Sequence, residues 1–214
     1  MSRWERPIKS QLSKKYHETM AQIVLKNLSP DRYAGLELAD KPDLQDIERD
    51  IGVEVVRAIA KDEGEIEGWL GKYPFFKGKE KEIADKIFSR YGGKFLDGEY
   101  RIFCWPVRAD NFDLVLSVLG EKLKKLNEGG YVEIKHNELF VDSSILADRN
   151  MLVEALQTML DRQAGFDIKF ERVFVCVPSW LYIFDLIDGC ASGVKLHNQS
   201  EWLAEARNRV ESNV

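Results

Sequence analysis

Cysteine and histidine are both scarce in this sequence of 214 residues, and neither is spaced for a metal site or a disulfide framework. The three cysteines are odd in number and include no CxxC pair, which argues against structural zinc and fits a reducing compartment. The three histidines show no HExxH or similar spacing, so we expect each to be structural rather than a metal ligand. These absences predict a cytoplasmic protein with free thiols.

Long apolar runs are also missing. The longest one, residues 174–187, is interrupted by Pro178, Ser179 and Asp185, and is too short and too broken to span a bilayer. The first ten residues, MSRWERPIKS, contain no apolar signal core, so we do not expect secretion. The sequence therefore predicts no membrane partner.

Three common catalytic motifs are absent. Gly-Lys pairs occur at 71–72, 78–79 and 93–94, but none has the preceding glycine and the following Ser or Thr of a phosphate-binding loop. No GxGxxG follows a predicted strand, and there is no GxSxG nucleophile elbow. These patterns argue against a P-loop nucleotide hydrolase, a dinucleotide-binding enzyme and a serine hydrolase of the α/β type.

The remaining composition is that of an ordinary globular domain. Hydrophobic residues make up 44% of the chain and charged residues 31%, with a net charge of −5. Such a charge does not favour a passive nucleic-acid coat, although basic residues gather in residues 1–15 and again at Lys122, Lys124 and Lys125. We predict one mixed α/β domain over residues 1–214, with room for a helical insertion between about 60 and 95.

Hydrophobic periodicity predicts the elements of this domain. Helices are expected over about 10–28, 62–71 (weakly), 80–91, 111–127 with Asp110 as its cap, a segment capped by Asp148 with Val153 on its apolar face, and a last helix from Asn198. Strands are expected on both sides of a turn at 45–50, over 100–107, and as a hairpin turned at Pro178-Ser179. A further hairpin is expected between Tyr131–Lys135 and Glu138–Asp142, turned at His136-Asn137.

One stretch, KPDLQDIERDIGVEVVRA at residues 41–58, combines acids with a dense apolar strand. Glu54 lies between Val53 and Val55, although glutamate is depleted in strands and costly to bury unpaired. Asp43 ends the preceding extended segment, so a hairpin would bring the two carboxylates together across it. Two such hard oxygen ligands suit Mg²⁺ or Mn²⁺, which leaves its other positions to water and phosphate. This pattern favours phosphodiester hydrolysis.

PDL followed by a short turn and GVEVVRA resembles the core of the PD-(D/E)xK, or restriction-endonuclease-like, nuclease superfamily, in the manner of its divergent bacterial members. The resemblance covers about 18 residues and implies a mixed central β-sheet flanked by helices. It implies that Asp43 and Glu54 bind the divalent metal and that the substrate is DNA or RNA. It also implies a lysine two residues after the second acid, and here that position is Val56.

The missing lysine leaves two hypotheses. In the first, the protein is a metal-dependent nuclease whose cation comes from a neighbouring helix. Lys122 is the favoured candidate, because helical phasing places it on the flank of the apolar face, and Lys125 is a weaker second. In the alternative, the domain is catalytically inactive and binds nucleic acid or a protein partner. Further site candidates are Glu37, as a third acid, and Arg57, which is expected on the opposite strand face; Glu18 is expected to lie away from the apolar face of its helix.

Overall fold

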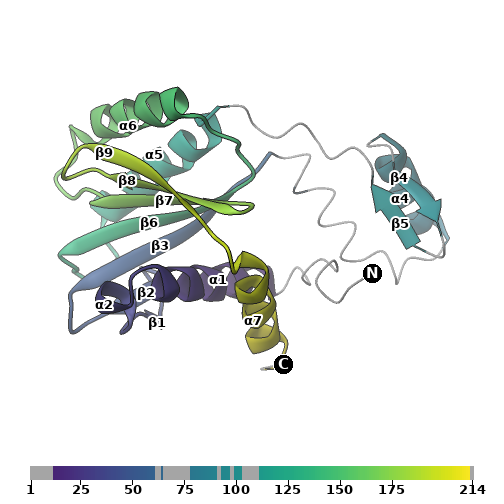
Figure 1. The fold of residues 1–214 in the computed structure, drawn as a ribbon, viewed down its shortest axis with the longest axis horizontal. Coiled ribbons are helices and arrows are strands. Elements are labelled where there is room, and N and C mark those ends of the chain that lie inside the picture. The colour runs from purple at the N-terminus through teal and green to yellow at the C-terminus, as the bar shows by residue number, and fades with distance from the viewer. Residues whose placement is uncertain are drawn as a thin grey trace.

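The computed structural model of the chain describes residues 12–60, 64, 78–90, 93–96, 99–102 and 111–212, and it shows an α/β fold around one large mixed sheet (Figure 1). The central strands β3, β6 and β7 run parallel, and an antiparallel pair of strands flanks them on each side. The order in space is the order in the chain: β1 (Glu37–Leu38), β2 (Leu44–Asp46), β3 (Ile51–Ala58), β6 (His136–Ser143), β7 (Arg172–Val177), β8 (Trp180–Asp185) and β9 (Cys190–Lys195). The predicted mixed sheet flanked by helices is confirmed.

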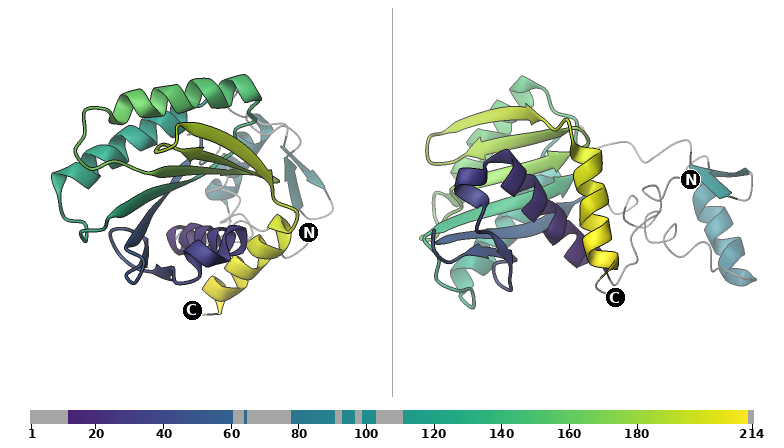
Figure 2. Two further views of the ribbon diagram at one scale, coloured as in Figure 1. Left: turned by 60° about the vertical axis from the view of Figure 1, so that its left-hand side comes forward. Right: turned by 60° about the horizontal axis from the view of Figure 1, so that its bottom comes forward.

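Helices cover both faces of this sheet, as Figure 2 shows from two sides. One face carries α1 (Ser13–Leu28), α2 (Pro30–Tyr33) and α7 (Gln199–Glu211), and the other carries α5 (Asp113–Glu128) and α6 (Arg149–Gln163). The three layers follow from the sequence, since parallel strands need helical crossovers that return over a face of the sheet.

Two apolar cores lie between these layers, and β3 contributes to both. Ile51, Val53 and Val55 pack with α1 and α7, whereas Val56 and Ala58 pack on the side of α5 and α6. This division is the ordinary alternation of a strand, whose successive side chains point to opposite faces. Glu54 therefore belongs to the α5 side of the sheet, where a carboxylate lies next to an otherwise apolar layer.

Between β3 and α5 the described residues contain a second, smaller group of elements. It consists of α4 (Lys79–Arg90) and an antiparallel pair made of β4 (Gly93–Leu96) and β5 (Glu99–Ile102). The helix predicted over residues 80–91 is present as α4. The helix predicted over 62–71 lies outside the described residues apart from Gly64, and so does the second half of the strand predicted over 100–107.

Several local signals gave correct boundaries. The first helix ends at Leu28, one residue before the Ser29-Pro30 start of α2. Asp148 caps α6 by accepting a hydrogen bond from the Met151 backbone N–H at 2.9 Å. The hairpin of β7 and β8 turns at Pro178-Ser179 as predicted, because Ser179 adopts a left-handed conformation with φ of 69°.

Other predictions were wrong. Residues 131–135 form no strand; they are a loop in which Val132 is 50% exposed, and β6 pairs in parallel with β3 instead of turning back in a hairpin. Gly129 and Gly130, both with positive φ, start this loop by ending α5. Val153 does not face the core but solvent. The strand β9 was missed, since CASGVK has neither bulky residues nor clear alternation.

Asp110, the expected cap of the long helix, lies outside the described residues, and α5 begins at Asp113. Within the part of the chain that the structure describes, no helix has the length and apolar content needed to cross a membrane.

Candidate functional site

The two acids singled out in the sequence lie on one hairpin of the sheet. The pairs Leu44–Val53 and Asp46–Ile51 set the antiparallel register of β2 and β3, and one further step places Asp43 level with Glu54. Asp43 does not continue the strand. Its carboxylate oxygen Oδ2 instead accepts a hydrogen bond from the backbone N–H of Val55 at 2.9 Å. The side chain therefore replaces the backbone partner that β3 would otherwise have where β2 ends. Both acids are buried, with exposed fractions of 4% for Asp43 and 7% for Glu54.

Lys122 of α5 provides a cation for this hairpin. Its ammonium contacts the Oε1 atom of Glu54, so the lysine that local spacing does not place at Val56 arrives from a helix 68 residues away in the chain. The Lys122 side chain is largely buried, which agrees with a stem that runs along the apolar layer and ends at the acid. The second oxygen of Glu54, Oε2, is buried and has no hydrogen-bond partner. Burying such an oxygen is costly, so this half of the carboxylate is left short of a donor or a cation.

Asp43 is approached from the other helix layer. The ammonium of Lys14 lies 3.1 Å from Asp43 Oδ1 and 3.2 Å from Glu18 Oε1, and so bridges the two acids. Its hydrogen bond to Asp43 raises the pKa of Lys14. Burial raises the pKa of the Glu18 carboxyl, and the nearby Asp43 carboxylate adds to this rise while Lys14 opposes it. Glu18 was expected to lie away from the apolar face of α1. That expectation was wrong, because Glu18 lies beside Asp43.

Tyr131, at the start of the loop between α5 and β6, completes the cluster. Burial raises the pKa of its phenol, and the charges of Glu54, Asp43 and Asp40 raise it further, so the hydroxyl lies close to these acids and stays protonated. The loop is held here because the Val132 backbone N–H donates to the Lys41 carbonyl at 3.1 Å. The start of α1, the residue before β2, helix α5 and the loop after α5 thus meet at the part of the β3 edge that β2 leaves open. We call this set the acid cluster: Glu18, Asp43, Glu54, Lys14, Lys122 and Tyr131.

The acid cluster offers hard oxygen ligands, but not an enclosed metal cage. Among the residues that the structure describes, no group of three or more His, Cys, Asp or Glu side chains is arranged to hold a metal ion. A divalent cation here would therefore be bound by one or two carboxylates and otherwise by water or phosphate, which is the usual arrangement for Mg²⁺. The unpartnered Oε2 of Glu54 fits such a ligand.

The other residues proposed from the sequence lie elsewhere. Glu37 is on β1, largely exposed, and pairs with Lys26 of α1 at 3.0 Å. Arg57 points to the α1 face, as expected, and its Nε lies 3.4 Å from Asp142 Oδ2. Lys125 is exposed near the end of α5, one residue after Lys124.

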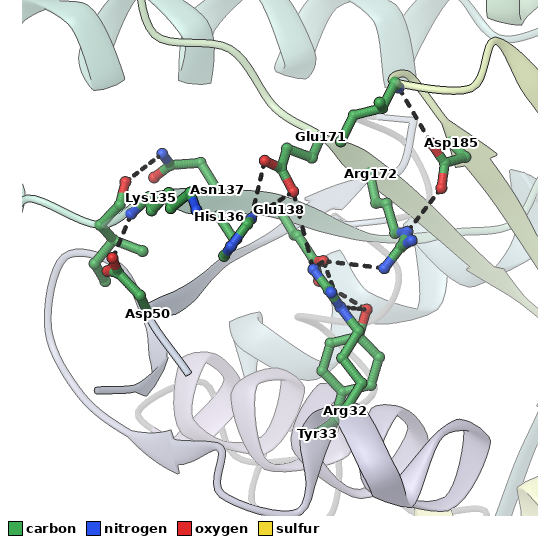
Figure 3. Close-up of polar contacts among 12 residues, drawn as sticks. Arg32, Tyr33, Asp50, Lys135, His136, Asn137, Glu138, Glu171, Arg172 and Asp185 are labelled. Carbon is green, nitrogen blue, oxygen red and sulfur yellow. Dashed lines mark hydrogen bonds and ion pairs between the residues drawn. The ribbon is translucent and has the colours of Figure 1, made fainter. Parts of the chain in front are cut away.

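A second polar cluster surrounds Glu138 at the start of β6, and Figure 3 shows how its side chains converge from α2, β6 and β7. Arg32 donates to Glu138 Oε1 through Nη2 at 2.6 Å and Nε at 3.2 Å, and the Tyr33 hydroxyl donates to Oε2 at 2.9 Å. Arg172 lies 3.7 Å from the same carboxylate and also bonds Asp185 at 2.9 Å. Every oxygen of Glu138 is satisfied, which is the arrangement expected when a buried charge joins elements of a fold.

Sequence reasoning missed Glu18, Tyr131 and Glu138. The Lys14–Glu18 spacing of four residues was a usable signal, since such pairs lie on one side of a helix. Tyr131 was overlooked because the pattern of residues 131–135 predicted a strand there, whereas these residues form a loop. Nothing in the local sequence pointed to Glu138, whose partners Arg32 and Tyr33 lie 106 and 105 residues away.

Comparisons with family models, with curated proteins and with solved structures give no match to this chain.

Proposed function

We propose that this protein is a divergent nuclease-like hydrolase that cleaves phosphodiester bonds in DNA or RNA with Mg²⁺ or Mn²⁺ at the acid cluster. The observation that carries the proposal is the contact between Lys122 and Glu54, because it supplies from α5 the cation that the strand lacks at Val56. The topology supports it as well, because it accords with a restriction-endonuclease-like core. It has a first helix, then an antiparallel hairpin that bears the two acids, and then a parallel strand reached through a helix.

Each residue of the acid cluster has a defined task in this proposal. Asp43 and Glu54 would hold the divalent cation, which would polarise a phosphate oxygen and lower the pKa of a bound water. The ammonium of Lys122 would stabilise the negative charge that a phosphodiester gathers during attack by water. The Val55 backbone N–H fixes the orientation of Asp43, so that at least one of the two acids is held in place before any ligand binds.

The second candidate is a catalytically inactive domain of the same fold that binds nucleic acid or a protein partner. One observation favours it. Lys14 and Lys122 already contact Asp43 and Glu54, so the two acids are compensated by the chain itself and the fold does not depend on a metal.

A cleavage assay decides between the two. Labelled single-stranded DNA, double-stranded DNA and RNA are incubated with the protein and Mn²⁺ or Mg²⁺, and the products are resolved on gels. We expect cleavage of at least one substrate, and a loss of roughly 100-fold or more in Lys122→Met, as when one preorganised charge-stabilising group is removed. Lys124→Met is the matched control, because this exposed lysine lies on the same helix, and its rate should equal that of the wild type.

A double variant sharpens the test. Val56→Lys in the Lys122→Met background puts the cation back at the strand position on the same face as Glu54, and part of the lost rate should return. If the wild type cleaves none of the three substrates with either metal, the hydrolase proposal fails and the inactive domain is the better description.

A further inference from the structure

Both carboxylate oxygens of Asp43 already have partners within the protein. Oδ2 accepts a hydrogen bond from the Val55 backbone N–H at 2.9 Å, and the Lys14 ammonium lies 3.1 Å from Oδ1. The contact with Val55 is part of the hairpin and ties the carboxylate to the edge of β3. A divalent cation that binds Asp43 therefore does so through Oδ1, which is the oxygen that Lys14 contacts.

The two lysines of the acid cluster are held very differently. The side chain of Lys122 is 17% exposed, whereas that of Lys14, on the first turn of α1, is 73% exposed. An exposed lysine gains little from an ion pair, because its long side chain loses conformational freedom and water screens the charges. Lys14 is therefore the cation that can leave the cluster, while Lys122 stays with Glu54.

Glu18 gives a displaced Lys14 a second partner. The Lys14 ammonium lies 3.2 Å from Glu18 Oε1, and the two residues are four apart on α1, a spacing at which the pair forms within the helix alone. At Glu54 the situation is simpler, since Oε2 is buried and has no hydrogen-bond partner. A cation that enters the cluster thus meets one carboxylate oxygen without a partner, and it has to displace an ammonium only at Asp43.

The position of Lys14 is not explained by the helix on which it lies. The first turn of α1 has no acidic residue and contains Lys14 and Lys15, although positive charge is unfavourable at the positive end of a helix dipole. Lys15 is exposed and lies one residue further on, about 100° around the helix axis. Lys14 is stabilised here by Asp43 and Glu18, and Lys15 is a natural control for its charge.

We propose that Lys14 is a tethered counter-ion of the acid cluster, which Mg²⁺ or Mn²⁺ has to displace from Asp43 and which thereby weakens metal binding. This inference rests on the proposed function, whose metal site it regulates. Without metal the ammonium bridges Asp43 and Glu18. With metal it stays beside Glu18 alone, because an ammonium and a divalent cation on one oxygen repel each other. Metal binding is then an exchange of one cation for another.

Metal affinity tests this role without any substrate. Mn²⁺ is titrated into the full chain, and free Mn²⁺ is measured by electron paramagnetic resonance. We expect Lys14→Met to bind Mn²⁺ about fivefold more tightly than the wild type, the factor for one ion pair at the upper end of the exposed range. Lys14→Arg keeps the cation and should bind no more tightly than the wild type. Lys15→Met removes the same charge from the same turn, and its dissociation constant should stay within about twofold of the wild-type value, because salt screens a distant exposed charge.

Chemical labelling of the wild type tests the displacement itself and does not depend on the folding of a variant. An amine-reactive reagent is added in limiting amount, with and without saturating Mg²⁺, and the modified lysines are identified by mass spectrometry. The hydrogen bond to Asp43 raises the pKa of Lys14, which keeps the unreactive ammonium form. We therefore expect Mg²⁺ to increase labelling at Lys14 and to leave labelling at Lys15 unchanged.

The outcomes separate this inference from the proposed function. Equal Mn²⁺ affinity in Lys14→Met and the wild type, or labelling at Lys14 that Mg²⁺ does not change, overturns the counter-ion and leaves Lys14 as a residue that only joins α1 to the hairpin. If Lys14→Met binds more tightly but no substrate is cleaved, the counter-ion stands and the hydrolase proposal fails. If cleavage is observed with unchanged affinity, the hydrolase stands and the counter-ion fails. If neither protein binds Mn²⁺, both proposals fail.

Discussion

The carboxylates of Glu138 and Glu54 are both buried on strands of one sheet, yet their surroundings differ. Glu138 is completely inaccessible, and arginine and tyrosine donors satisfy both of its oxygens. Glu54 has one lysine on Oε1 and no partner on Oε2. A buried polar group that only joins elements of a fold is most stable when all its hydrogen bonds are made within the protein. A group that binds a ligand must instead keep at least one atom without a protein partner. The contrast separates a structural cluster from a candidate site on one molecule.

The largest effect is expected from breaking the complete cluster. Glu138→Ala leaves Arg32 and Tyr33 without their acceptor in a buried setting, and we expect the free energy of unfolding to fall by about 3 kcal/mol, the lower end for a buried pair because Arg32 is partly exposed. Glu54→Gln should lower it by less, about 1 kcal/mol, because the amide oxygen of glutamine can still accept a hydrogen bond from Lys122. Urea denaturation measures both. If both variants lost the same free energy of unfolding, the difference drawn between the Glu138 cluster and the Glu54 cluster would be wrong.

Metal should affect only the incomplete cluster. Saturating Mg²⁺ or Mn²⁺ at about 100 times its dissociation constant stabilises a native-state site by about 2.7 kcal/mol, or roughly 5–10 °C in melting temperature for a chain of this size. Glu54→Gln should abolish this rise, while the exposed Glu121→Gln on α5 should keep it. Differential scanning calorimetry with and without metal gives the shift. A rise that persists in Glu54→Gln would place the metal elsewhere.

The smallest effect concerns pH and Glu18. Since burial and Asp43 raise its pKa in the folded state, the folded chain binds more protons than the unfolded chain from about pH 4.5 upward. The stability contributed by the protonated form is therefore present at low pH and is lost as pH rises through the folded-state pKa. Glu18→Gln should be more stable than the wild type at neutral pH, with the advantage shrinking as pH falls toward 4.5. Denaturation midpoints between pH 4 and 7 test this, and an advantage independent of pH would contradict it.

The sequence predicted the hairpin of the acids because short-range signals are enough for a turn between two strands. Helical phase also predicted that Lys122 would reach the rim of the apolar face, where it now contacts Glu54. Tertiary contacts decided the rest. Glu18 was judged from its own helix alone, whereas the edge of the sheet made it a neighbour of Asp43. The register of β6 could not be inferred, because its parallel partner β3 is separated from it by more than seventy residues.

The chain distances within the acid cluster have a consequence for the unfolded protein. Asp43 is 12 residues from its backbone partner Val55, while Lys122 is 68 residues from Glu54. Loop-closure entropy makes the longer encounter costlier by about 1.5 kcal/mol, so a fluctuating chain brings the two acids together far more often than it brings the lysine to them. The hairpin that carries the two acids can therefore form early, and the contact of Lys122 with Glu54 waits for the docking of α5.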